Sequence, residues 1–77
     1  MAGTIQLELL MTLKRYQPDS YHAYPIGRGV TVRELLERLK IPEYEVNLVF
    51  INGIKGNLDS TLKGDERVSL FPPLGGG

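Results

Sequence analysis

The sequence predicts an α+β fold in which one amphipathic helix crosses one face of a mixed sheet. Three observations lead to this prediction. Residues 4–13 alternate between apolar and polar, residues 31–40 carry a helical apolar pattern, and residues 47–51 and 67–71 are dense apolar runs. The chain of 77 residues is long enough for one domain. A helix this short is marginal alone, so its apolar stripe must pack on the sheet.

The N-terminal third of the chain predicts two strands. Within residues 4–13 the polar and apolar side chains alternate, which is typical of a strand with one buried face. The apolar members of this stretch are Ile5, Leu7, Leu9, Met11 and Leu13. Leu10 interrupts the polar face, either as a scattered surface residue or as a contact with a partner. Residues 14–20 predict a turn. Residues 21–26 predict a short second strand, and Pro25 indicates that this strand lies at an edge.

The helix is predicted directly after a glycine-containing break at residues 27–29. Thr31 and Glu34 have the spacing of a capping box, in which each side chain satisfies the free backbone N–H of the other residue. The apolar side chains recur at i, i+3, i+4 and i+7, which indicates one buried helix face of roughly ten residues in total. They are Val32, Leu35, Leu36 and Leu39. Pro42 is expected to stop the helix.

The second half of the chain predicts the rest of the sheet. The apolar run at 47–51 ends in Asn52-Gly53, a pair that favours a type I′ hairpin turn. Residues 54–55 would begin a short return strand. Residues 67–71 predict the last strand, which Pro72-Pro73 must end because proline has no N–H to donate. The expected order is strand, strand, helix, strand, short strand, strand, written ββαβ(β)β.

Composition excludes several classes of function. The chain has nine Lys+Arg and nine Asp+Glu, whereas nucleic-acid binders usually carry a basic excess. It has no cysteine and one histidine, His22, so no metal site is predicted. No apolar run approaches the length of a membrane span, and no secretory signal is visible. A cytoplasmic protein that binds neither nucleic acid nor membrane is therefore expected.

The sequence also offers no catalytic residue. The glycines at 27–29 lack the Lys-Ser/Thr ending of a phosphate-binding loop and predict a plain turn. His22 has no acid or cysteine beside it in sequence, so a solvent-facing or hydrogen-bonded histidine is the better interpretation. The carboxylates lie in turns or beside Tyr44 and are expected to be solvated. They are Glu43, Glu45, Asp59, Asp65 and Glu66. We therefore expect a protein that is not an enzyme.

The C-terminal end, residues 71–77, has a more specific pattern. Two prolines favour an extended exit from the sheet, and the bare glycines Gly75, Gly76 and Gly77 can enter a channel too narrow for a side chain. Residues 72–77 would reach roughly 20 Å when extended. The terminal carboxyl group, with a reference pKa of about 3.3–3.7, is ionised at neutral pH and can attack phosphorus.

Residues 1–74 are thus predicted to form the folded domain and residues 75–77 a flexible tail. The other interpretation of these glycines is a frayed chain end or a remnant of cloning, because chain ends are commonly disordered and rich in glycine.

Taken together, these features resemble the MoaD/ThiS sulfur carriers, which are β-grasp, ubiquitin-like proteins. The resemblance covers nearly the whole chain and is most specific in residues 64–77. Phe-Pro-Pro before a glycine tail looks more like the small subunit of molybdopterin synthase than the thiamine carrier. The residues that carry the resemblance are Asn52-Gly53 after an apolar strand, Leu58, Leu62, Gly64-Asp65, and Val68-Ser69-Leu70-Phe71-Pro72-Pro73 before the glycines.

The resemblance implies a mechanism and partners. An E1-like adenylyltransferase would use ATP and Mg²⁺ to adenylate the Gly77 carboxylate, and a sulfur donor would convert it to a thiocarboxylate. Gly75 and Gly76 would be the stem of the tail. The thiocarboxylate would serve the large subunit of molybdopterin synthase, or a thiazole synthase. Residues near the docking surface would be Phe71, Pro72, Pro73 and Leu74.

The chain itself would bind no cofactor and no metal. The family pattern ends in two glycines and this chain in three, so Gly76 is the reacting residue if Gly77 is removed or foreign. The alternative function is a ubiquitin-like modifier joined to a lysine, or an interaction module.

Overall fold

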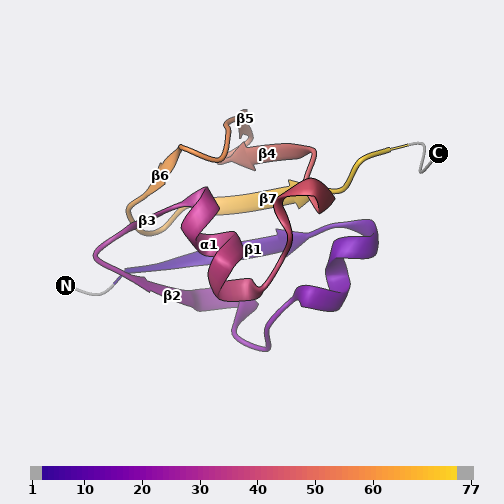
Figure 1. Ribbon diagram of the computed structural model, residues 1–77. Coiled ribbons are helices and arrows are strands. Elements are labelled where there is room, and N and C mark those ends of the chain that lie inside the picture. Colours follow the sequence, from indigo (N-terminus) through magenta and orange to yellow (C-terminus); the bar gives the residue numbers. More distant parts are fainter. Residues whose placement is uncertain (1–2, 75–77) are drawn as a thin grey trace.

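The structure, a computed structural model, describes residues 3–74. A five-stranded sheet in the order β2-β1-β7-β4-β5 carries one α-helix across its face (Figure 1). The central strands β1 and β7 are parallel, and the other neighbours in this sheet are antiparallel. The predicted mixed sheet with one crossing helix is confirmed. Its strands are β1 (Gly3–Leu9), β2 (Tyr24–Gly27), β4 (Leu48–Ile51), β5 (Ile54–Lys55) and β7 (Arg67–Phe71).

The first strand is shorter than predicted. β1 ends at Leu9, and Met11–Tyr16 forms a 3₁₀ helix, η1, instead of continuing the strand and entering a loop. Met11 has a φ of 54°, which turns the chain out of the sheet and leaves its side chain 60% exposed. The Leu13 N–H then donates to the Leu10 carbonyl at 3.0 Å, and the Leu13 side chain returns to the core. The prediction that Met11 continues the buried face was wrong, because one turn of 3₁₀ helix also brings Leu13 inward.

The second strand begins later than predicted. Tyr21–Ala23 forms a short 3₁₀ helix, η2, and only the following residues form β2. β2 lies at the edge of the sheet, as Pro25 indicates. Gly29, in the turn that follows, has a φ of 125°. A Cβ there would lie 3.0 Å from the Leu62 carbonyl oxygen, so both backbone angle and space require glycine.

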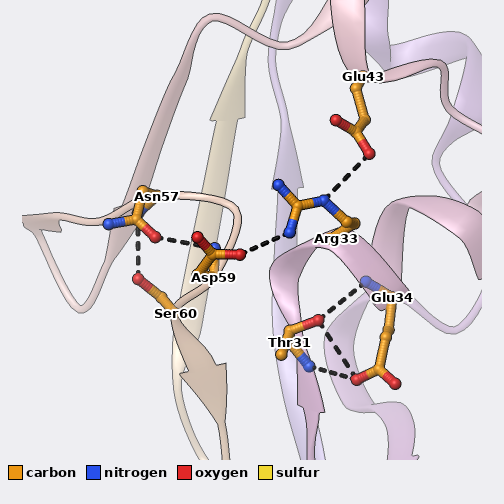
Figure 2. Close-up of polar contacts among 7 residues, drawn as sticks. All are labelled: Thr31, Arg33, Glu34, Glu43, Asn57, Asp59 and Ser60. Carbon is orange, nitrogen blue, oxygen red and sulfur yellow. Dashed lines mark hydrogen bonds and ion pairs between the residues drawn. The ribbon is translucent and has the colours of Figure 1, made fainter.

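Helix α1 (Val32–Leu39) begins at the predicted capping box. The Thr31 hydroxyl accepts from the Glu34 N–H at 3.1 Å, and a Glu34 carboxylate oxygen accepts from the Thr31 N–H at 2.8 Å (Figure 2). Val32, Leu35 and Leu36 are buried against the sheet. The helix ends at Lys40, which adopts the left-handed conformation with a φ of 62°, two residues before Pro42. The helix is therefore eight residues long, shorter than predicted.

Arg33 connects the start of α1 to two other segments. Its guanidinium pairs with Asp59, in the loop after β5, and with Glu43, in the 3₁₀ helix η3 (Glu43–Glu45) (Figure 2). The hydrogen bond and charge of Asp59 are the main causes that raise the pKa of Arg33 above its ordinary value. Since all three side chains are exposed to solvent to a large extent, we assign the contacts a positional role and little stability.

The hairpin of β4 and β5 has the predicted turn. Asn52 and Gly53 both have positive φ values, 54° and 81°, as a type I′ turn requires. The Asn52 side chain also accepts from the Arg67 N–H at 2.9 Å, which fixes the hairpin against β7. The turn sets the pairing of β4 with β5, and the Asn52 bond to Arg67 helps hold the register with β7, in which Val49 faces Leu70 and Phe50 faces Ser69.

A second, two-stranded sheet was not predicted. It pairs β3 (Val30–Thr31) with β6 (Thr61–Leu62) beside the N-terminus of α1. The pairing places Leu62, one of the residues that carry the resemblance, in the core: its side chain is fully buried. The core between sheet and helix consists of Ile5, Leu7, Leu9, Leu13, Ile26, Val30, Val32, Leu35, Leu36, Ile41, Val49, Leu62, Val68 and Leu70.

Candidate functional site

The end of β7 is held on both sides by its neighbours. The Leu10 N–H donates to the Leu70 carbonyl at 3.1 Å, and the Asn47 N–H donates to the Phe71 carbonyl at 2.8 Å. The last two residues of β7 are thus each held by a residue next to a neighbouring strand, Leu10 after β1 and Asn47 before β4. Figure 1 shows the chain running away from the sheet beyond this point. The point at which the C-terminal segment leaves the folded domain (the body) after Phe71, which we call the exit, therefore has a defined position.

The predicted docking residues are exposed to different degrees. Phe71 is half-buried, Pro72 is buried, and Pro73 is exposed. Leu74 is 67% exposed. Pro72 thus belongs to the body, and the free part of the segment begins at Pro73. Fully extended, residues 73–77 span at most about 16 Å, less than the reach counted from Pro72. The tail glycines Gly75, Gly76 and Gly77 lie outside the described residues, so their predicted role stays a prediction.

An aromatic patch lies beside the exit on the open face of the sheet. Leu70 points into the core, so Phe71 points to the opposite face, where its cross-strand partner Leu48 also lies. The rings of Phe71 and Phe50 meet edge to face, with centroids 5.7 Å apart and planes at 82°. We call Leu48, Phe50 and Phe71, all half-buried, the aromatic patch. Only Phe71 was predicted. The apolar run at 47–51 carries no alternation that separates its two faces, but the alternation of side chains along any strand places Leu48 and Phe50 on the face opposite to Val49.

The open face beyond the aromatic patch is polar. The Ser69 hydroxyl donates to the Glu8 carboxylate at 2.8 Å across β1 and β7. Two shallow cavities of about 210 and 230 Å³ adjoin there, and Gln6 and His22 line both. His22 is exposed, as predicted, and its ring centroid lies 3.9 Å from that of Tyr21. Nothing in the lining of these cavities assigns a chemical role to His22.

Two 3₁₀ helices flank the exit. In Figure 1, η1, between β1 and β2, and η3, just before β4, lie at the same end of the molecule as the tip of β7. Glu45 of η3 binds η1 directly, since it accepts from the Arg15 guanidinium and from the Tyr16 hydroxyl. The hydrogen bond to Tyr16 and the charge of Glu45 raise the pKa of Arg15 above its ordinary value. The exit is thus framed by two short helices that are bound to each other.

The predicted solvated carboxylates do not gather into a site. Glu43 and Asp59 pair with Arg33, and Glu66 accepts from the backbone N–H groups of Lys63 and Gly64 at 2.7 Å each. Within residues 3–74 no group of three His, Cys, Asp or Glu side chains is placed to hold a metal ion. In the same part of the chain, no helix is long and apolar enough to cross a membrane.

The arrangement defines a ubiquitin-like β-grasp protein, and comparison with known proteins gives the family. A family model described as Mut7-C ubiquitin matches residues 4–74. The chain belongs to this Mut7-C ubiquitin family. No curated protein matches it.

Solved structures share the fold. The Haloferax volcanii HVO 2177 protein has a TM-score of 0.74 and 21% identity, over 99% of this chain and 88% of that one. A putative molybdopterin converting factor, subunit 1, from Pyrococcus furiosus has a TM-score of 0.64 and 21% identity, over 94% and 99%. SAMP1 from Haloferax volcanii has a TM-score of 0.65 and 18% identity, over 97% and 100%. The predicted β-grasp fold and the resemblance to MoaD-type ubiquitin-like proteins are confirmed, while these identities show fold alone.

Proposed function

We propose that this protein is a sulfur carrier whose Gly77 carboxylate is adenylated and then converted to a thiocarboxylate that supplies sulfur for molybdopterin synthesis. The observation that supports this proposal most directly is the exit geometry. β7 is held to its end at Phe71 by bonds from residues next to both neighbouring strands, and the chain then leaves the body at the exposed residues Pro73 and Leu74. A short, side-chain-free segment beyond a rigid body can bring one carboxylate into a partner's active site.

The chemistry takes two balanced steps. An oxygen of the Gly77 carboxylate attacks the α-phosphorus of ATP, and pyrophosphate leaves with its electron pair. Hydrosulfide, or a donor at the same oxidation level, then attacks the acyl carbon. The C–O bond to AMP breaks, and AMP, the thiocarboxylate and one proton are the products. Mg²⁺ and ATP belong to the E1-like activating enzyme, so the chain needs no cofactor of its own and acts as a carrier, not as an enzyme.

The body would provide recognition. We propose that the aromatic patch and the exposed residues Pro73 and Leu74 dock on the large subunit of a synthase, with Pro72 holding the segment in place. Aromatic side chains, phenylalanine included, are enriched at protein–protein interfaces relative to the rest of the surface. We choose molybdopterin synthase as the acceptor because Phe71-Pro72-Pro73 precedes the glycines and because one protein of the same fold is a putative molybdopterin converting factor subunit. Since activation consumes ATP, we place the reaction in the cytoplasm.

Pyrophosphate exchange tests the activation step. We expect the full chain, incubated with ATP, Mg²⁺, labelled pyrophosphate and an E1-like enzyme of the source organism, to drive the label into ATP. A chain that lacks residues 75–77 should drive none, because the acceptor carboxylate is then too close to the body to reach the enzyme's nucleotide. The matched control is the variant Lys55→Ala, at an exposed position on β5, which should exchange like the wild type.

Two results would contradict the proposal. Equal exchange by the full and the shortened chain would show that the tail does not carry the reacting group. Formation of a stable amide with a lysine of another protein, with no thiocarboxylate, would identify a ubiquitin-like modifier instead.

A further inference from the structure

The large apolar side chains that the body exposes are unevenly distributed. Among the described residues, four such side chains are largely exposed, namely Met11, Tyr44, Ile54 and Leu74. Three of them lie on the segments at the tip of β7: Met11 begins η1, Tyr44 is the middle residue of η3, and Leu74 is on the exiting chain. Only Ile54 is elsewhere, on β5 near the opposite end of β4, where Ile51 pairs with it. Exposed apolar side chains on segments that share one end of a molecule are candidates for an interaction surface.

Met11 is exposed at a conformational cost. Its φ of 54° lies in the left-handed region, which residues with a Cβ rarely adopt. Glycine would make the same turn without strain. Leu10, directly before it, bonds to Leu70 near the end of β7, so Met11 is held next to the exit. The turn itself is needed to bring Leu13 into the core. A glycine could make the same turn, so folding does not explain the exposed apolar side chain at this position, and backbone strain of this kind concentrates at functional positions.

Tyr44 is presented on a fixed support. Both residues beside it are anchored through their side chains, Glu43 to Arg33 of α1 and Glu45 to Arg15 and Tyr16 of η1. Between these anchors the Tyr44 side chain is 81% exposed. Its helix η3 is placed beside the exit because Asn47, two residues after η3, bonds to the Phe71 carbonyl. A tyrosine that is held in position but uncovered is the type of side chain that dominates binding interfaces.

We infer that Met11, Tyr44 and Leu74 form a docking rim, an apolar surface around the exit that binds the adenylate-forming enzyme. This inference rests on the proposed function. From Leu74, the residues up to Gly77 span at most about 10 Å. An enzyme that holds the Gly77 carboxylate against its nucleotide must therefore approach the exit closely, and we infer that it meets the exposed side chains on the segments beside the exit. The partner's complementary surface is an apolar collar at the mouth of its tail channel.

Steady-state kinetics of pyrophosphate exchange, with the carrier as the varied substrate, test the docking rim. We expect the double variant Met11→Ala, Tyr44→Ala to raise the KM for the carrier roughly tenfold or more, with kcat changed little, because lost side-chain contacts of this kind weaken association by that order. Tyr44→Phe, which keeps the ring, should retain most of the wild-type KM. Ile54→Ala removes an equally exposed apolar side chain far from the exit and should behave as the wild type.

Met11→Gly separates docking from folding. Glycine relieves the left-handed strain, so this variant should melt at a temperature equal to or above that of the wild type. The KM of the activating enzyme for this variant should still rise, because the Met11 side chain is missing. If the double variant has the same KM as the wild type, or if Ile54→Ala raises the KM as much as the double variant does, the docking rim is wrong. Neither result would contradict the proposed function. If the wild-type chain supports no exchange at all, the proposed function fails, and the docking rim fails with it.

Discussion

Replacing Gly76 with alanine is expected to lower the rate of adenylation of the chain by roughly a hundredfold while leaving its fold intact. A reacting group displaced by about 1 Å can lose that much rate. The added methyl group must enter the channel through which the partner reaches the Gly77 carboxylate, and the proposed function requires that channel to be narrow. The body ends its contacts at Pro72, so a methyl group four residues later should not alter the stability of the core.

The Gly76 prediction needs two measurements on the same preparation. Pyrophosphate exchange gives the adenylation rate, and a thermal melt gives the stability. Gly75→Ala, one residue farther from the reacting carbon, should reduce the rate less. Equal rates of pyrophosphate exchange for the Gly76 variant and the wild type would contradict a narrow channel around the tail.

Leu36→Ala is expected to lower the free energy of unfolding by about 2–5 kcal/mol, the usual effect of removing a buried leucine side chain and leaving a cavity. Leu36 is 1% exposed and lies in the core between α1 and the sheet. A domain of this size has a small total stability, so the variant should be largely unfolded at moderate denaturant concentration.

The matched control for Leu36 is its neighbour on the solvent side of the helix, Glu37→Ala. This variant should stay within about 0.5 kcal/mol of the wild type, because its side chain is exposed. Urea unfolding followed by circular dichroism measures both variants. A loss below about 1 kcal/mol for Leu36→Ala would mean that the helix does not pack as described.

Much of the fold could be predicted where a local pattern has a single structural meaning. The capping box of Thr31 and Glu34 marks the start of α1, and Asn52-Gly53 marks a hairpin turn and thereby the register of β4 with β5. Pro72-Pro73 marks the end of β7. In each case the side chain or the missing N–H acts within a few residues, so the sequence contains the whole interaction.

The errors arise where one pattern fits two structures. Alternating apolar residues through Leu13 fit a long strand, but Leu13 is also buried by a 3₁₀ turn that starts after Leu10. The pairing of β3 with β6 joins segments about thirty residues apart, and neither two-residue strand carries a periodic pattern. Lys40, in the left-handed conformation, ends α1 where no glycine signals the stop.

The candidate site was predicted only in part. The segment from Phe71 to Leu74 was identified from the sequence, because prolines and glycines that follow a strand can be recognised without knowledge of the fold. It did not show that Pro72 is buried, nor that Phe50 and Leu48 join Phe71, because both depend on strand register. Met11 and Tyr44 were also missed. Their positions beside the exit depend on the bonds of Leu10 to β7 and of Glu45 to η1.

The most direct test of the proposed carrier function is the intact mass of the chain after incubation with an E1-like enzyme, ATP, Mg²⁺ and sulfide. Exchange of one carboxylate oxygen for sulfur should raise the mass by about 16 Da. Fragmentation should place the gain on Gly77. An unchanged mass in a reaction that still consumes ATP, or a gain located outside the C-terminal glycines, would contradict the account.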